Sequence, residues 1–299
     1  MSHATLFLVT RPVSVEGVLD DAQRAAPDFL PADPAEPQLS VLDLGVSRGD
    51  GCFESISVVR GHAQALESHL ERFAASARRL DLPEPDLDVW RAAVHAVIQA
   101  HVPVPELFVK MMLTRGIEGA NAPTGWVYAE TAPDFREART TGIRVVTLDR
   151  GYRHDVNRTS PWLLQGAKTL SYAVNRAAIR EAHRRGANDV IFVSSDGIVL
   201  EGPTSNLILL DGGRVRTPQT DLGILAGTTQ ASAFEFFESR GLRTEYATIS
   251  ADELERADAA WLVSSVRQAA PINAIDDREL LVDGPLTEGL NEYLLARQE

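Results

Sequence analysis

Two pairs of short apolar segments, each joined by a glycine-containing turn, constrain the fold of this chain more than any other feature. In the first pair, residues 190–193 and 198–200 flank Ser195-Asp196-Gly197. In the second pair, residues 206–210 and 214–216 flank Asp211-Gly212-Gly213. Turns of this composition between apolar segments are typical of β-hairpins. The chain is therefore expected to form antiparallel or mixed sheets, and not the repeated strand–helix–strand units of a Rossmann domain.

Five segments of the chain are predicted to be helices, the first of them from its helical periodicity. Apolar residues at positions 66, 70, 73, 77 and 80 predict an amphipathic helix over residues 67–80. Further helices are expected at 87–99, 171–185, 227–241 and 286–297, and further strands at 51–60, 107–114, 125–129, 143–148, 243–248 and 259–263. Residues 25–37, which are rich in alanine, proline and aspartate, are expected to form an exposed loop.

The polar segment 131–141, which contains Pro133 and several charged residues, is the best candidate for a domain boundary. A chain of 299 residues is long enough for two domains of ordinary size. We therefore predict an α+β fold with a small N-terminal α/β domain over residues 1–130, a linker over 131–141 and a larger domain over 142–299.

Charge and cysteine content narrow the range of partners and compartments. A net charge of −13 disfavours non-specific binding to nucleic acid or anionic membranes, because both need a positive surface. Cys52 is the only cysteine, so an intrachain disulfide is impossible, which fits a reducing compartment. Neither a signal peptide nor an apolar run of roughly 18 residues is evident. A cytoplasmic protein that binds neither membrane nor nucleic acid is expected.

Lysine is used very sparingly in this chain. Lys110 and Lys168 are its only lysines, and the other 27 of its 29 basic residues are arginines. Arginine replaces most surface lysines but cannot act as a primary amine that condenses with a carbonyl. Lys168, which is predicted to lie at the start of a helix where the dipole disfavours an ammonium ion, is therefore a candidate nucleophile. A lysine retained by chance in a loop is the alternative.

Glu201 is the candidate acidic group. It directly follows the strand at 198–200, and Gly202-Pro203 break that strand at once. A carboxylate at such a sheet edge can hold a proton on a heteroaromatic nitrogen through a charge-assisted hydrogen bond. A solvated glutamate in a turn is the alternative.

Three segments contain candidate phosphate ligands. Thr228 is predicted to cap the helix at 227–241, where backbone N–H groups and threonine hydroxyls can bind phosphate. Ser265 and Arg267 follow the strand at 259–263. Arg72 flanks the apolar face of the helix at 67–80, where a guanidinium can bind two oxygens. A plain N-cap and surface arginines are the alternatives.

Several other chemistries lack their sequence signatures. The chain contains neither a phosphate-binding Walker motif nor Gly-x-Gly-x-x-Gly after a strand. Its seven histidines do not show zinc-ligand spacing, so no metal site is expected. A Gly-x-Ser-x-Gly motif, which would support a serine hydrolase, is also missing.

Taken in order, these segments resemble the class IV aminotransferases, the fold-type IV pyridoxal-phosphate enzymes. That family includes branched-chain, D-amino acid and (R)-amine aminotransferases and aminodeoxychorismate lyases. The resemblance covers about residues 42–271 and rests on five motifs in a specific order. They are Gly49-Asp50-Gly51-Cys52-Phe53-Glu54, His69-Leu70-Glu71-Arg72, Lys168, Glu201-Gly202-Pro203-Thr204-Ser205-Asn206, and the segment 223–229.

The resemblance implies a role for each of these motifs. Lys168 would form a Schiff base with pyridoxal 5′-phosphate and shuttle a proton, while Glu201 would pair with the pyridine nitrogen and keep the ring an electron sink. The phosphate ligands would be Arg72, Thr228, Thr229 and Ser265, with Ser205 and Asn206 also near the cofactor. The family further implies a small N-terminal α/β domain, a larger mixed-sheet domain that binds the cofactor, and a homodimer.

The implied reaction is transfer of an amino group from an amino acid or (R)-amine to a keto acid. Phe53, Arg115 and Arg267 are the candidate substrate contacts. The motif around Gly51 and the segment after Lys168 look closest to lyase-like members, so release of pyruvate and 4-aminobenzoate from aminodeoxychorismate stays open. A protein that binds the cofactor without catalysis is the third possibility.

Overall fold

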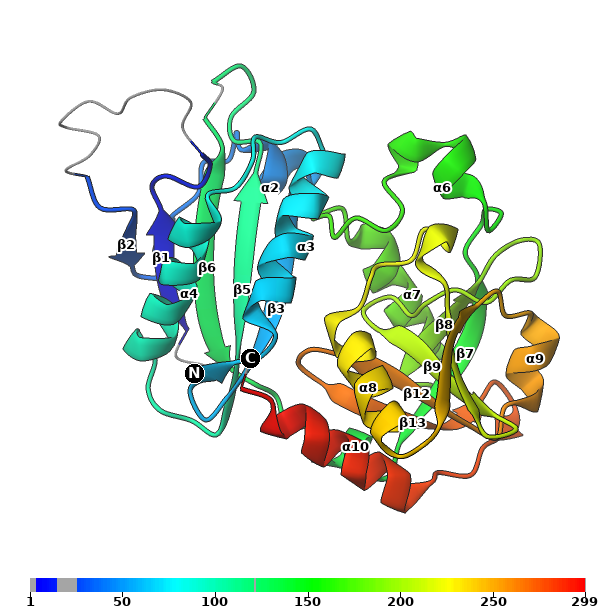
Figure 1. Ribbon diagram of the computed structural model, residues 1–299. Coiled ribbons are helices and arrows are strands. Elements are labelled where there is room, and N and C mark those ends of the chain that lie inside the picture. The colour runs from blue at the N-terminus through cyan, green and yellow to red at the C-terminus, as the bar shows by residue number, and fades with distance from the viewer. Residues whose placement is uncertain (1–3, 15–25, 121, 299) are drawn as a thin grey trace. The chain divides into compact units, whose positions relative to one another are not determined.

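The computed structural model describes residues 4–14, 26–120 and 122–298 of the chain. These residues form two compact units, each built around a β-sheet (Figure 1). The first unit contains the described residues up to Pro133 together with Ala167–Tyr172, and the second contains Asp134–Gly166 and Ala173–Arg297. The segment around Lys168 thus groups with the first unit, although it follows the polar stretch at 131–141 in the sequence.

The first unit contains a six-stranded sheet whose paired strands are all antiparallel, in the order β2-β1-β6-β5-β3-β4. Its strands are β1 (Thr5–Val9), β2 (Phe29–Ala32), β3 (Gly51–Val59), β4 (His62–Ala63), β5 (Glu106–Thr114) and β6 (Thr124–Thr131). Its helices are α2 (Leu44–Arg48), α3 (Leu66–Arg79) and α4 (Leu87–Ala100).

The core of the first unit lies between its sheet and the two long helices, α3 and α4 (Figure 1). Alternate residues of β3 are fully buried, as the period of a strand requires for one covered face. Phe73 of α3 and Trp90 of α4 are also fully buried, and their rings meet edge to face at 4.8 Å. The predicted helices at 67–80 and 87–99 therefore form, and both bury their apolar stripe.

The second unit contains a mixed sheet in the order β11-β10-β9-β12-β13-β7-β8, with β14 paired to β13. Its strands are β7 (Ile143–Asp149), β8 (Asp189–Val193), β9 (Asn206–Asp211), β10 (Arg214–Pro218), β11 (Arg243–Ala247), β12 (Ala259–Ser264), β13 (Gln268–Ile275) and β14 (Arg278–Glu279). Its helices are α5 (Arg136–Thr140), α6 (Val156–Thr159), α7 (Ala173–Arg184), α8 (Thr228–Ser239), α9 (Ala251–Arg256) and α10 (Gly284–Ala296), with 3-10 turns η1 (Pro161–Leu163) and η2 (Thr220–Leu222).

Both faces of the central strands in this second sheet are buried. Leu207 and Leu209 of β9 belong to one apolar cluster, while Ile208 between them belongs to another that includes Phe237 of α8 and Leu290 of α10. Strands covered on both sides are continuously apolar, which explains the apolar segment that predicted β9. The α+β fold with mixed and antiparallel sheets is confirmed.

The structure corrects some predicted elements. Part of the expected loop at 25–37 is strand β2, which pairs with β1; Ala25 lies outside the described residues. The predicted hairpin at 190–200 forms its turn, with the Ser194 N–H donating to the Ile198 oxygen, although residues 198–200 are not a full strand. Strand β13 was not predicted. It carries Pro271 in its interior, and proline usually argues against a central strand.

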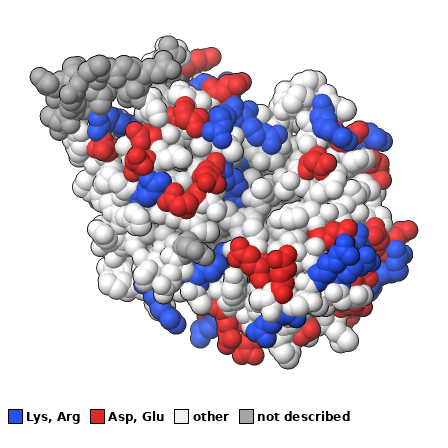
Figure 2. All heavy atoms as spheres, viewed as in Figure 1, with Lys and Arg blue, Asp and Glu red and all other residues white. Residues whose placement is uncertain are grey.

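The surface of each unit carries both signs of charge. On the face shown in Figure 2, basic and acidic side chains lie interspersed over each unit. Among the described residues, no helix is both long and apolar enough to cross a lipid bilayer.

Candidate active site

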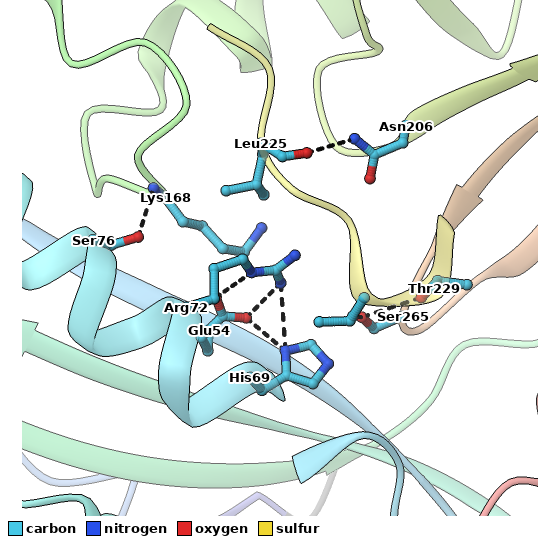
Figure 3. A network of polar contacts seen from close by, with 10 residues as sticks. Glu54, His69, Arg72, Ser76, Lys168, Asn206, Leu225, Thr229 and Ser265 are labelled. Carbon is cyan, nitrogen blue, oxygen red and sulfur yellow. Dashed lines mark hydrogen bonds and ion pairs between the residues drawn. The ribbon is translucent and has the colours of Figure 1, made fainter. Parts of the chain in front are cut away.

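Lys168 lies in a short extended segment that pairs with the start of β3. The Phe53 N–H donates to the Lys168 carbonyl at 3.0 Å, and the Leu170 N–H donates to the Gly51 carbonyl at 2.8 Å. The Lys168 N–H in turn donates to the Ser76 hydroxyl of α3 at 3.1 Å. Two backbone hydrogen bonds to β3 and one to the Ser76 hydroxyl, the last drawn in Figure 3, therefore hold the lysine segment against the sheet and a helix of the first unit.

This geometry corrects the predicted surroundings of the lysine. Helix α7 begins at Ala173, five residues beyond Lys168, so a helix N-terminus does not position the amine. The Lys168 Nζ instead lies 4.7 Å from the centre of the Phe53 ring, and Tyr172 packs edge to face on that ring at 5.5 Å. The amine of Lys168 thus lies within cation–π distance of an aromatic ring that Tyr172 supports.

Arg72 belongs to a buried polar cluster on the first unit. Its Nε and Nη2 donate to the two oxygens of Glu54, both at 2.7 Å, and the His69 Nδ1 lies 2.7 Å from Glu54 Oε2 (Figure 3). Glu54 and His69 are 0% and 1% exposed, and Arg72 is 12% exposed. His69, Arg72 and Ser76 share one face of α3, because they are spaced by three and four residues.

The cluster shifts the protonation of its members. Burial acts to raise the pKa of Glu54, but the Arg72 charge and the hydrogen bonds from Arg72 and His69 outweigh it and hold that pKa well below its ordinary value. Burial lowers the pKa of His69 despite the opposing effect of Glu54. Burial and the Glu54 charge raise the pKa of the Cys52 thiol to about 12, so this cysteine is not a nucleophile. At neutral pH the cluster is an ion pair with a neutral imidazole that donates through Nδ1.

Glu201 of the second unit is held at both carboxylate oxygens. Its Oε2 accepts from Asn206 Nδ2 at 3.2 Å, and its Oε1 accepts from the Leu225 N–H at 3.3 Å. Asn206 Nδ2 also donates to the Leu225 carbonyl at 2.8 Å (Figure 3). Asn206 therefore orients the carboxylate and ties it to the segment that leads into α8.

Hydroxyl groups gather at the start of α8. Gly227, and not Thr228 as predicted, is the N-cap, and it has no side chain to accept from the first-turn N–H groups. The hydroxyls of Thr228 and Thr229 each lie 3.5 Å from the Ser265 hydroxyl at the end of β12. Backbone N–H groups and three hydroxyls at a helix start are the donors that bind a phosphate group. The structure thus brings together three predicted phosphate ligands.

The two arginines predicted as substrate contacts, Arg115 and Arg267, have internal partners. Arg115 donates to both oxygens of Asp50 and to the carbonyls of Leu80 and Asp81, so each nitrogen of its guanidinium is used. Arg115 therefore ties the end of α3 to the loop before β3.

Arg267 of the second unit is likewise bonded to other residues of its own unit. It forms an ion pair with buried Asp189 at 2.8 Å and donates to the Ser205 hydroxyl at 2.8 Å. Ser205, predicted near the cofactor, is the acceptor in that bond and is itself buried. The contacts of Arg115 and Arg267 do not favour either as a clamp for substrate.

Sequence reasoning missed two groups of residues. Glu54, His69 and Ser76 received no specific role, although the polar residues at 69, 72 and 76 form a row at helical spacing beside the apolar face of α3, a signal visible in the sequence. A cavity beside Glu201 was also missed, and nothing in the sequence marks it. It is lined by Arg150, Tyr152, Gln165, Asn175, Phe192 and Glu201.

The donor sets fit a phosphorylated heteroaromatic aldehyde. The second unit supplies a held carboxylate for a ring nitrogen and, through Asn206 and the Leu225–Gly227 segment, a connected phosphate cradle. A Cβ at Gly227 would come 2.0 Å from Asn206 Oδ1, so this cradle is closely packed. The first unit supplies the primary amine of Lys168 and a guanidinium.

Comparison with known proteins agrees with this chemistry. The family model described as amino-transferase class IV matches residues 51–275, three quarters of the chain. This chain is a class IV aminotransferase. The prediction of the family and of an enzyme of this class is therefore confirmed.

Similar aminotransferases cover almost the whole chain. A bifunctional aminodeoxychorismate lyase / D-amino acid transaminase of Mycobacterium tuberculosis is 42% identical over 257 residues, covering 83% of this chain and 89% of the relative. A solved fold IV transaminase of Curtobacterium pusillum is 61% identical, with a TM-score of 0.92, and covers 99% of this chain and 100% of its own. A hypothetical aminotransferase of M. tuberculosis in a PLP-bound form is 38% identical, with a TM-score of 0.86 and coverage of 98% and 97%.

Proposed function

We propose that this class IV aminotransferase transfers an amino group from a D-amino acid to a keto acid, with pyridoxal 5′-phosphate as cofactor. Two observations carry the proposal: the first unit holds an unreplaced lysine, Lys168, and the second holds a carboxylate, Glu201, that is bonded at both oxygens. The 42% identical relative named a D-amino acid transaminase supports the choice of donor, and (R)-amines are a related class that the same screen would test.

Pyridoxal phosphate, when bound, supplies an aldehyde that condenses with primary amines and a ring that withdraws electrons from an adjacent carbon. Lys168 is proposed to hold the cofactor covalently through Nζ. As a free amine, Nζ would act as the base that takes a proton from the substrate α-carbon. Its backbone hydrogen bonds to Phe53, Ser76 and β3 fix the base while the side chain moves.

Glu201 is proposed to keep a proton on the ring nitrogen. The bonds from Asn206 and the Leu225 N–H hold its carboxylate in one orientation, and a fixed anion favours the charged form of an adjacent heteroaromatic nitrogen. Arg72, Thr228, Thr229 and Ser265 are proposed to hold the phosphate, with the first-turn N–H groups of α8. Phe53 is proposed to line the substrate side of Lys168.

A second candidate function is the aminodeoxychorismate lyase reaction, with release of pyruvate and 4-aminobenzoate. The bifunctional name of the 42% identical relative favours it, and the same lysine and acid would serve it. The two reactions differ in their requirement for a second substrate. Transamination needs a keto acid acceptor for turnover, whereas elimination does not.

An absorbance screen separates the candidates. The holoenzyme is mixed with D-amino acids, L-amino acids or (R)-amines without any keto acid. A transaminase is expected to lose its visible absorbance band with D-amino acids and to regain it when a keto acid is added. A lyase would release pyruvate from aminodeoxychorismate continuously without an acceptor.

Lys168→Ala is the matched negative variant, and Lys110→Ala is the positive control. Lys110 is expected to be dispensable, because its Nζ lies over the rings of Phe108 and Tyr128 on the sheet of the first unit. Lys168→Ala is expected to lose turnover and covalent cofactor linkage. Normal turnover by Lys168→Ala would contradict the proposed function.

A homodimer is also proposed, as the family resemblance implies. Exposed apolar side chains on the first unit support it, since Val41, Leu42 and Val46 are 82%, 65% and 56% exposed. A cytoplasmic location is proposed on the strength of the single, buried cysteine.

A further inference from the structure

Glu54 holds the Arg72 guanidinium along one bidentate edge. Glu54 accepts from Nε and Nη2, both at 2.7 Å, which is the side edge of the guanidinium plane. The other edge, formed by Nη1 and Nη2, is directed away from that carboxylate by the planar geometry of the group. A planar fork fixed along one edge therefore has a single orientation.

His69 holds the carboxylate that holds Arg72. Its Nδ1 lies 2.7 Å from Glu54 Oε2 and 3.4 Å from Arg72 Nη2, so the imidazole donates to the same oxygen that receives Nη2. Glu54 and His69 are almost completely buried, and they come from β3 and α3, two packed elements of one unit. This pair has little freedom to rotate, because its partners occupy both carboxylate oxygens.

We propose that Glu54 and His69 are positioning residues that pre-orient Arg72 for the phosphate end of the cofactor. The inference rests on the proposed phosphate role of Arg72 and adds that this role depends on the buried pair. An arginine side chain otherwise loses considerable rotamer freedom when it binds a ligand. A carboxylate on one edge removes that loss before the cofactor arrives, and the neutral histidine keeps the carboxylate in place without adding charge.

The test compares pyridoxamine 5′-phosphate with pyridoxamine, which lacks the phosphate. Neither compound forms a covalent bond with Lys168. The dissociation constant of pyridoxamine divided by that of pyridoxamine 5′-phosphate therefore reports the contribution of the phosphate alone. The ratio is measured by fluorescence titration of the full-length protein after removal of its cofactor. The variants are Arg72→Leu, Glu54→Gln, His69→Leu and His69→Asn. Asparagine keeps an N–H donor near the position of Nδ1, whereas leucine removes it.

The wild-type ratio is expected to fall at least about tenfold in Arg72→Leu, Glu54→Gln and His69→Leu, as loss of a charge-assisted bond predicts. His69→Asn is expected to retain most of it. If Arg72→Leu lowers the ratio but His69→Leu does not, the positioning role is wrong and the phosphate role of Arg72 stands. If Arg72→Leu leaves the ratio unchanged, the phosphate role itself is wrong. Equal weakening of both ligands in His69→Leu would mean a merely structural role and would overturn the inference.

Circular dichroism of each variant checks that the protein is folded. If Glu54→Gln fails to fold, the pair of His69 variants still decides the question, because they differ only in the donor at one position.

Discussion

Glu201 shows how neighbouring groups define the function of a single residue. A glutamate after a strand is common on protein surfaces, and its sequence position alone does not distinguish a solvated turn from a ligand. In the structure, Asn206 and the Leu225 N–H occupy one oxygen each, which fixes the direction of the carboxylate. Arg115 and Arg267 show the opposite outcome, since both were candidates for substrate binding and both are bonded to buried or backbone acceptors.

Replacement of Glu201 by glutamine tests this residue. The amide keeps the shape of the side chain but cannot hold a proton on the cofactor ring. We expect Glu201→Gln to retain cofactor and to slow proton abstraction roughly a hundredfold or more, a typical contribution for a group that controls protonation. Single-turnover loss of the visible absorbance band with a D-amino acid measures this rate. Glu288→Gln, on the exposed side of α10, is the control, and an unchanged rate in Glu201→Gln would place the acid elsewhere.

The start of helix α8 shows how an element creates a binding site. A side-chain cap would satisfy the first-turn N–H groups, but the N-cap is Gly227, which cannot do so. The backbone at Gly227 has ordinary dihedral angles, with φ −82 and ψ 122, so its glycine is not required by conformation. It is required by space, because Asn206 Oδ1 would lie 2.0 Å from an added Cβ.

Gly227→Ala is therefore expected to displace Asn206 and, through it, Glu201. We expect the variant to bind pyridoxamine 5′-phosphate about tenfold more weakly or worse, since it loses a hydrogen bond to a charged group. Equilibrium titration measures the affinity. Gly284→Ala, at the start of α10 where no atom lies within 4 Å of an added Cβ, is the matched control and should bind as wild type does. Wild-type affinity in Gly227→Ala would show that the cradle tolerates movement.

At the scale of the whole molecule, buried titratable groups link stability to pH. The pKa of His69 is lowered in the folded protein, so the unfolded chain binds the extra proton first as pH falls. This contribution to stability is present above the ordinary histidine pKa of about 6.5 and decreases below it. The pKa of Glu54 is also lowered, so its contribution decreases in a second window, below the ordinary glutamate pKa of about 4.5.

The wild-type protein is expected to lose stability between pH 6.5 and pH 5, mainly through His69. His69→Asn should lose less over this range, because asparagine does not titrate. The urea midpoint at fixed salt and at several pH values measures the difference. The control is His62→Asn, since His62 is exposed on β4 and should not change the profile. Equal losses in His69→Asn and wild type would show that His69 does not control acid stability.

Local sequence patterns determined most of the secondary structure of this protein and its family. Hairpin turns, helical periodicity and the order of five motifs predicted the sheet type, the main helices and the family. These signals are local because turn chemistry and amphipathic spacing act between residues that are near in sequence. They did not identify β13. Its interior proline and small side chains are typical of a loop, and it is held in the sheet by pairing with β12 and β7.

Tertiary structure alone decided which polar groups are paired. The segment of Lys168 joins β3 and α3, which lie more than ninety residues earlier, and Glu54 meets Arg72 across eighteen residues. Arg115 and Arg72 look alike in the sequence, yet Arg115 ties the end of α3 to the loop before β3, and Arg72 lies in a buried cluster with Glu54 and His69. Hydrogen bonds between distant segments depend on packing of whole elements, and a sequence read locally does not contain that information.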